Sequence, residues 1–193
     1  ELARQLARKA IQQIPPEEYD AIITNAGGCG SHLKHYSKLL AEDPAYASRA
    51  RLWDTKVKDI HEWLIEIGIQ APLNHAPAQV VTYHESCHLC HGQKIVSQPR
   101  GILRSIPGLE LVELPESNWC CGSAGIYNIT QPEQSAKLLD RKAACVRSTG
   151  CNQVATSNPG CHLQLRRGLG SDAEVTQPVL LLAAAYRNEA AHG

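Results

Sequence analysis

The sequence predicts an α/β protein, in which a mostly parallel sheet carries helices on both of its faces. Short β-branched runs alternate with segments of helical periodicity along the 193 residues, in the order α-β-α-β-α-β-α-β-α. In addition, residues 23–34 (ITNAGGCGSHLK) resemble residues 156–166 (TSNPGCHLQLR). Because both stretches run from a strand end through a small turn and a cysteine into a helix, we expect the tail of one structural repeat at 1–74 and a complete repeat at 75–193.

The first part of the chain is expected to contain four elements. Apolar side chains recur at helical spacing from residue 2 onward, and Pro15 and Pro16 end that pattern. Gly68 is a typical residue to follow the last turn of a helix. The expected elements are a helix at 2–14, a strand at 21–25, and helices at 32–41 and 45–67.

The second part repeats the sequence strand, turn, helix. In the long helical segment, Ala136, Leu139, Ala143 and Val146 fall on one face, which is therefore expected to point inward. The run PVLLLAAAY at 178–186 is the longest apolar stretch, and it is too short to span a membrane. The expected elements are strands at 79–84, 109–114 and 153–157, and helices at 132–149 and 178–190.

Composition limits the classes of function. The chain is 43% hydrophobic and 20% charged, which is typical of a soluble globular protein. Lys plus Arg equals Asp plus Glu at 19 each, and no basic block is present, so we expect no nucleic-acid partner. The chain lacks Met and Phe and opens within a helical pattern, so it is expected to be a piece of a longer chain. The missing residue types also leave open a designed or edited fold without metal.

Eight cysteines are many for this length, and no signal peptide is visible. A cytoplasmic location is therefore expected, where such a count indicates metal or redox chemistry rather than disulfides. Adjacent cysteines are poor disulfide partners, because their Cα atoms lie only about 3.8 Å apart. The candidate ligands each follow a predicted strand: Cys87, Cys120, Cys121 and Cys161.

These four cysteines are expected to meet at one edge of the sheet. The carboxyl ends of parallel strands lie along a single edge, where open α/β sheets bind their ligands. Four thiolates suit either tetrahedral zinc or an iron–sulfur cluster. Nearby glycines and small residues would let backbone N–H groups approach the sulfurs.

The other cysteines and the histidines have plainer interpretations. Cys145 and Cys151 are expected to be inert thiols at the amino side of the sheet. Cys90 completes a C-x-x-C with Cys87 and stays open as a ligand, although a buried thiol is the more frequent outcome. The loop histidines are expected to be solvated more often than ligating: His84, His88 and His91.

The stretches YHESCHLCHGQ, NWCCGSAGIYNIT and SNPGCHLQL resemble the cysteine-rich CCG domain. That family includes a subunit of heterodisulfide reductase, lactate-utilisation proteins and the iron–sulfur subunits of glycolate dehydrogenase (glycolate oxidase). The motifs in this sequence most resemble the C-terminal region of the glycolate dehydrogenase subunits. The resemblance covers nearly the whole chain, with 75–193 as the second CCG repeat. The family pattern falls on Cys87, Cys120, Cys121, Gly122 and Cys161.

The resemblance implies a 4Fe-4S-type cluster, with zinc as the alternative metal. It implies a non-catalytic electron-transfer subunit that takes electrons from a flavoprotein oxidising glycolate, or a similar 2-hydroxy acid, and passes them to quinone or another membrane-associated acceptor. The location would then be cytoplasmic, with attachment to the inner face of the membrane left open.

The sequence also departs from the family pattern. Heterodisulfide reductase members end the motif in C-x-x-C and use five cysteines, whereas Gln164 occupies the last position here. In the first repeat, His32 stands at the equivalent place after Cys29. A heterodisulfide reductase-like or lactate-utilisation subunit and a structural zinc module for partner docking therefore stay open as alternatives.

Overall fold

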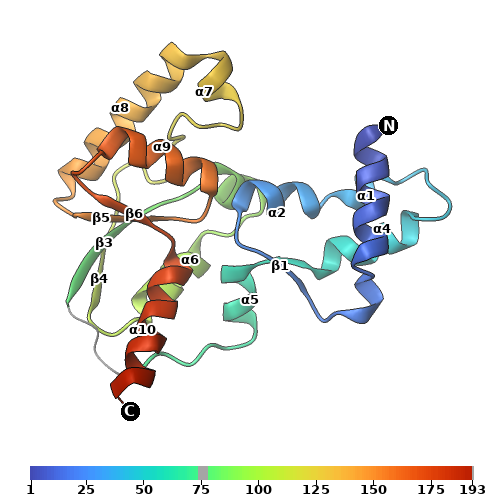
Figure 1. The fold of residues 1–193 in the computed structure, drawn as a ribbon, viewed down its shortest axis with the longest axis horizontal. Coiled ribbons are helices and arrows are strands. Elements are labelled where there is room, and N and C mark those ends of the chain that lie inside the picture. Colours follow the sequence, from blue (N-terminus) through green and yellow to red (C-terminus); the bar gives the residue numbers. More distant parts are fainter. Residues whose placement is uncertain (74–77, 193) are drawn as a thin grey trace.

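The structure is a computed structural model, and it describes residues 1–73 and 78–192. Its main sheet has four parallel strands in the order β4-β3-β5-β6 (Figure 1). The strand order reverses between β3 and β5, because β4 follows β3 on one side and β5 lies on the other side. The strands are β3 (Gln79–His84), β4 (Leu109–Val112), β5 (Gln153–Thr156) and β6 (Glu174–Thr176).

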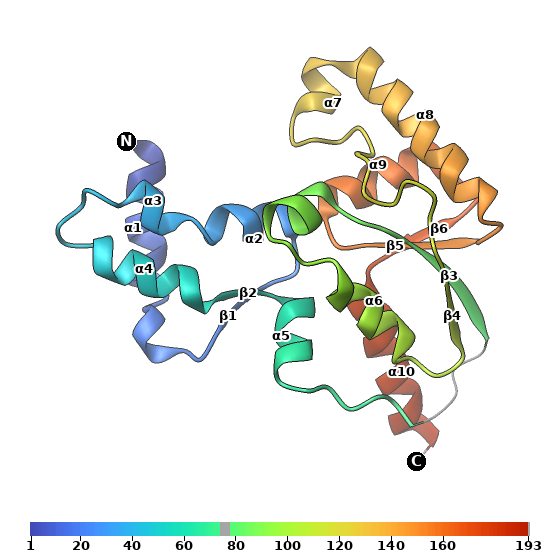
Figure 2. The ribbon, with the colours of Figure 1, turned by 180° about the vertical axis from the view of Figure 1, so that it is seen from behind.

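Helices cover both faces of this sheet, as the sequence predicts. Figures 1 and 2 show α8 and α9 on one face, and α6 and α10 on the other. Neighbouring residues of β5 alternate between the two faces: Val154 packs in a core with Val146 and Leu165, whereas Ala155 packs with Leu103. The helices are α6 (Ser97–Arg104), α8 (Pro132–Ser148), α9 (Pro159–Leu169) and α10 (Pro178–His192).

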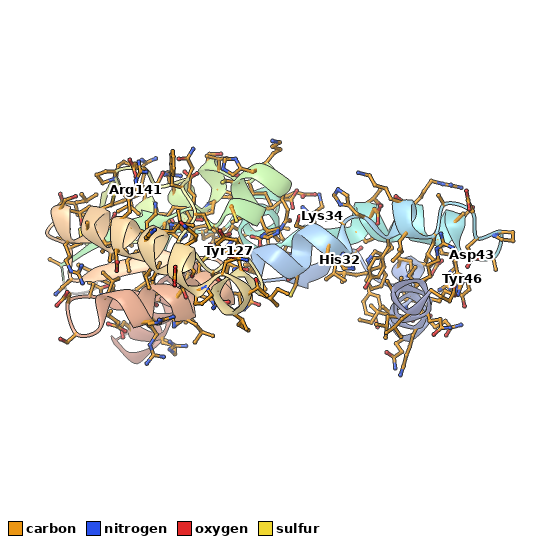
Figure 3. The ribbon with its side chains drawn as sticks, turned by 90° about the horizontal axis from the view of Figure 1, so that it is seen from above. His32, Lys34, Asp43, Tyr46, Tyr127 and Arg141 are labelled. Carbon is orange, nitrogen blue, oxygen red and sulfur yellow. The ribbon has the colours of Figure 1, made fainter. Side chains whose placement is uncertain are left out.

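The first part of the chain forms a smaller unit around a parallel pair of strands. Trp53 is buried there, stacks on Tyr36 with ring centroids 5.4 Å apart, and donates a hydrogen bond to the Leu33 carbonyl. In Figure 3, Asp43 and Tyr46 mark the end of the molecule farthest from Arg141. The elements are α1 (Leu2–Gln13), β1 (Ile22–Thr24), α2 (Gly27–Leu33), α3 (Tyr36–Leu39), α4 (Ala47–Lys56), β2 (Val57–Asp59) and α5 (Ile60–Glu66).

The prediction of one helix over 45–67 is wrong. Val57 leaves the helical path because it pairs with Ile22 of β1, which completes a two-stranded sheet. Asp59 then starts a new helix with a capping box, in which the Glu62 side chain accepts a hydrogen bond from the Asp59 N–H. The result is two short helices, α4 and α5, on either side of a strand.

Two further differences concern short elements. Helix α2 begins at Gly27 instead of 32, and it ends at Leu33 before the separate turn of α3. Strand β6 at Glu174–Thr176 was not predicted, because three residues are too few to show a strand periodicity. The predicted repeat boundary at 74/75 lies outside the described residues, so the division into 1–74 and 75–193 stays a prediction.

Helix α2 docks directly on the loops of the main sheet. The Gly27 N–H donates to the Ser157 carbonyl at 3.0 Å, and Gln93 Nε2 donates to the Gly27 carbonyl at 2.9 Å. The start of this helix is thus bonded to the turn after β5. Across residues 1–73 and 78–192, none of the helices combines the length and apolar character that a membrane crossing requires.

Candidate metal centre

The predicted cysteines lie beyond the carboxyl ends of the main strands. Cys87 follows β3 by three residues, and Cys161 lies in the first turn of α9, just after β5. These are the two strands at which the strand order reverses, which is the preferred ligand position of an open α/β sheet. Cys120 and Cys121 come from the long loop after β4.

The structure brings these four side chains into contact. Cys121 and Cys161 are buried, whereas Cys87 and Cys120 are partly exposed. Neighbouring sulfurs shift one another's pKa in the order Cys87, Cys120, Cys121 and Cys161, so the four side chains form a row. The doubled cysteine therefore supplies the two central sulfurs of a row that the other loops complete.

This proximity lowers the pKa of two of the four thiols and raises the pKa of the other two. Hydrogen bonds from Cys121 and Cys87 lower the pKa of Cys120 well below its ordinary value. A hydrogen bond from Cys121 likewise lowers the pKa of Cys161. The pKa of the other two thiols shifts in the opposite direction, because the interaction with Cys120 and burial raise the pKa of both Cys87 and Cys121. The lowered pKa values favour the thiolate form at Cys120 and Cys161, and binding of a cation would release the protons of the other thiols.

Neutral donors from the protein also point at the sulfurs. The Gly122 N–H donates to Cys120 Sγ at 3.3 Å, and Asn158 Nδ2 donates to Cys161 Sγ at 3.6 Å. The Asn158 side-chain oxygen also accepts the Gly28 N–H at 3.0 Å, which connects the α2 segment to the same cysteine. Such hydrogen bonds behind the ligands orient thiolates and tune a bound metal.

Gly122 is required at its position by geometry. Its φ is +89°, and a Cβ there would lie 2.4 Å from the Ser135 carbonyl oxygen. The Gly122 carbonyl accepts the Ser135 hydroxyl at 2.8 Å, and that hydroxyl accepts Gln164 Nε2 at 3.0 Å. Gln164, three residues after Cys161, therefore supports the cysteine loop from behind.

One histidine, His84, lies beside the cysteines, although the histidines of this region were expected to be solvated. A ring nitrogen of His84 and the sulfurs of Cys121 and Cys161 lie within 4.8 Å of one another. His84 is the last residue of β3, and this position at a strand end is the sequence signal that could have identified it as a site residue. The exposed His88 contacts Cys87 Sγ through Nδ1 at 3.7 Å, and His91 contacts the Asn118 carbonyl at 3.3 Å.

The other cysteines lie in different surroundings. Cys90 is buried, and burial raises its pKa to about 11, so it is a protonated thiol. Cys145 in α8 is partly buried and contacts Glu116, with Sγ 3.8 Å from Oε2. Cys151 bonds to the Thr149 carbonyl before β5, and Cys29 is exposed. That Cys145 and Cys151 are not ligands stays a prediction, and Cys90 stays open as a ligand.

The donor set fits a thiophilic metal centre. A row of four cysteine sulfurs matches the ligand type of structural zinc and of iron–sulfur clusters. The backbone and amide donors at the sulfurs suit a negatively charged metal–sulfur group.

A second polar chain resembles a hydrolytic triad in composition. Asp59 contacts His61 Nδ1 at 2.6 Å, and His61 Nε2 lies 3.4 Å from the Ser157 hydroxyl, which also contacts the Tyr83 hydroxyl at 3.3 Å. All four side chains are buried where the two sheets adjoin. Because this burial keeps a substrate from Ser157, these hydrogen-bonded side chains connect the two parts of the structure, and Ser157 does not act as a nucleophile.

Comparison with known proteins agrees with the residues described above. Residues 1–34 and 81–166 match the model of the CCG cysteine-rich domain. The probable glycolate oxidase iron-sulfur subunit of Bacillus subtilis is 43% identical over 86% of this chain and 38% of its own length. A subunit of the fumarate reductase (CoM/CoB) of Methanothermobacter marburgensis is 37% identical over 90% of this chain and 34% of its own length.

Lactate utilization protein A of Bacillus licheniformis is 25% identical over 87% of this chain and 70% of its own length. The chain spans only about a third of the length of the first two relatives, at 38% and 34%. The family match includes all four of these cysteines, Cys87, Cys120, Cys121 and Cys161. This chain belongs to the CCG cysteine-rich domain family.

Proposed function

We propose that this chain is the cluster-binding part of an iron–sulfur electron-transfer subunit. The observation that supports it most is the row of four cysteine sulfurs beyond the strands at which the strand order reverses. Its relatives include proteins named as glycolate oxidase iron-sulfur subunits. The proposed ligands are Cys87, Cys120, Cys121 and Cys161.

The bound group would be a 4Fe-4S-type cluster, which supplies one-electron chemistry at a potential set by its surroundings. The protein's part is to hold the group and to tune it. The Gly122 N–H and the Asn158 amide stabilise negative charge on the sulfurs, and the buried side chains of Cys121 and Cys161 exclude water from one side. No bond of a substrate needs to be made or broken here.

The proposed electron donor is a flavoprotein subunit that oxidises glycolate or a similar 2-hydroxy acid. This rests on the names of the relatives, since this chain covers 38% of the Bacillus subtilis protein and 35% of the Escherichia coli one. We propose quinone, or another acceptor at the cytoplasmic face of the membrane, as the destination of the electrons. A heterodisulfide reductase-like role is the second candidate, since the fumarate reductase (CoM/CoB) relative is 37% identical.

A structural zinc site is the third candidate. Four sulfurs with no open position are the usual ligand set of structural zinc, and such a module would serve to dock redox partners. Metal analysis of anaerobically purified protein separates the candidates. Iron with sulfide, and visible absorption that bleaches with dithionite, supports electron transfer, whereas zinc without visible absorption contradicts it.

The ligand set is tested by serine substitutions. We expect C87S, C120S, C121S and C161S each to lose most of the bound metal, because a hydroxyl is a much weaker donor than a thiolate. The matched controls are C145S and C151S, whose sulfurs contact Glu116 and the Thr149 carbonyl instead of the other thiols. Full metal content in C121S, or metal loss in either control, would show that the assigned ligands are wrong.

A further inference from the structure

We propose that His84 is an additional ligand of the metal centre, binding through one nitrogen of its ring. The inference deepens the proposed function and rests on it, because it concerns the same site and requires that the cysteines bind metal. It predicts a mixed sulfur and nitrogen ligand set instead of a centre held by thiolates alone.

The strand directs His84 toward the cysteines. Val81 and Tyr83 belong to the core on the α6 and α10 face of the sheet. Successive side chains of a strand point to opposite faces, so His84 points to the face covered by α8 and α9. Cys121 and Cys161 belong to the core on that face. The orientation of His84 is therefore built into β3 and does not depend on a loop.

The ring is buried without a conventional partner. His84 is 1% exposed, and among the described residues neither Nδ1 nor Nε2 has a nitrogen or oxygen partner for a hydrogen bond. Its polar neighbours are the sulfurs of Cys121 and Cys161, which lie within 4.8 Å of a ring nitrogen. Buried polar groups in folded proteins almost always find a partner, because leaving them without one costs free energy. A metal ion between His84 and the thiolates would take the lone pair of one ring nitrogen.

The spacing suits a shared ion. The ring nitrogen and the sulfurs of Cys121 and Cys161 lie within 4.8 Å of one another. Metal–nitrogen and metal–sulfur bonds of about 2.0–2.3 Å place two ligand atoms of one ion within about 4 Å. A shift of under about 1 Å would therefore bring the His84 nitrogen within bonding reach of a metal ion held by Cys121 or Cys161.

His88 provides the matched control. It lies in the same region and contacts Cys87 Sγ at 3.7 Å, yet its side chain is exposed and its Nδ1 already has that partner. If proximity to the cysteines were sufficient, both histidines would affect the centre alike. We expect only His84 to bind metal.

The test uses the whole chain, loaded anaerobically with iron and sulfide and reduced, with its histidines isotopically labelled. Pulsed electron paramagnetic resonance should show a strong hyperfine coupling to a histidine nitrogen. We expect the coupling to be lost in H84A and kept in H88A. H84C should keep its iron and have a lower reduction potential, because a charged thiolate replaces a neutral ligand.

Each outcome decides one of the two proposals. An iron-loaded wild-type chain without strong histidine coupling overturns the role of His84 and leaves the proposed function standing. A coupling that survives in H84A also overturns it. If H84A fails to fold, the labelled wild type and H84C still give the answer. If the chain takes zinc and no iron, the proposed function fails, and the nitrogen nuclear magnetic resonance shift of the labelled His84 ring reports ligation directly.

Discussion

Replacing Gly122 by alanine tests how the doubled cysteine is held in place. Gly122 has a φ of +89°, a conformation that side chains rarely adopt. Its new methyl group would meet the Ser135 carbonyl oxygen at 2.4 Å and Gln164 Nε2 at 3.2 Å. The Ser135 carbonyl belongs to the backbone of α8, so it cannot swing away as a flexible side chain could.

The expected cost has two parts. The left-handed conformation costs a non-glycine residue about 1–2 kcal/mol. Forcing a methyl group into a packed site typically adds about 1–3 kcal/mol. The free energy of unfolding should therefore fall by about 2–5 kcal/mol. For a chain of this length, each kcal/mol lowers the melting temperature by about 2–4 °C, which gives a loss of about 4–20 °C.

Gly125 is the matched control, three residues along the same loop. Its φ is +69°, and an added Cβ would have no heavy atom of the described residues within 4 Å. G125A should therefore lose only the conformational part, about 1–2 kcal/mol. Both variants are compared by chemical denaturation of the metal-free chain, since bound metal would stabilise the folded state. Equal losses in G122A and G125A would refute the argument that the contact with α8 dictates this glycine.

Two further substitutions separate buried from exposed interactions. D59A should lower the free energy of unfolding by about 3–5 kcal/mol, because it leaves His61 buried without its partner. The control D172A breaks a 2.7 Å ion pair whose side chains are half exposed, and it should cost under about 1 kcal/mol. W53A should cost about 3–5 kcal/mol in urea denaturation, since Trp53 is 2% exposed. W119A, at a residue 50% exposed, should cost far less, and equal losses within either pair would contradict the burial in the structure.

The main sheet was predictable because its strands and helices carry strong local periodicity. The alternation of strand and helix indicates parallel pairing, and parallel pairing places successive strand ends on one edge. That rule alone predicts that Cys87, Cys121 and Cys161 lie at the same edge of the sheet. The weak elements were missed. Strand β6 is too short to show a period, and β2 lies in a segment whose apolar spacing also fits a helix.

Strand β2 illustrates why local pattern was insufficient. Val57 occupies a position that continues the helical face of Trp53, and nothing in the adjacent residues distinguishes the two states. The deciding contact is with Ile22, which is far away in the sequence and pairs with Val57 in the parallel ladder. Such non-local pairing overrides helix propensity whenever the partner strand buries the residue.

The residue pattern was sufficient to predict the sheet type, the helices on both faces and the edge of the sheet where the four cysteines lie. The tertiary structure alone decided what stands next to them. His84 and His88 are both loop-adjacent histidines in the sequence, but the pleat of β3 buries the first against Cys161 and the turn after it exposes the second. The side chain of Gln164 is also placed by a distant segment, because its Nε2 donates a hydrogen bond to the Ser135 hydroxyl of α8. Side-chain direction and burial depend on contacts between distant segments, which a sequence pattern does not contain.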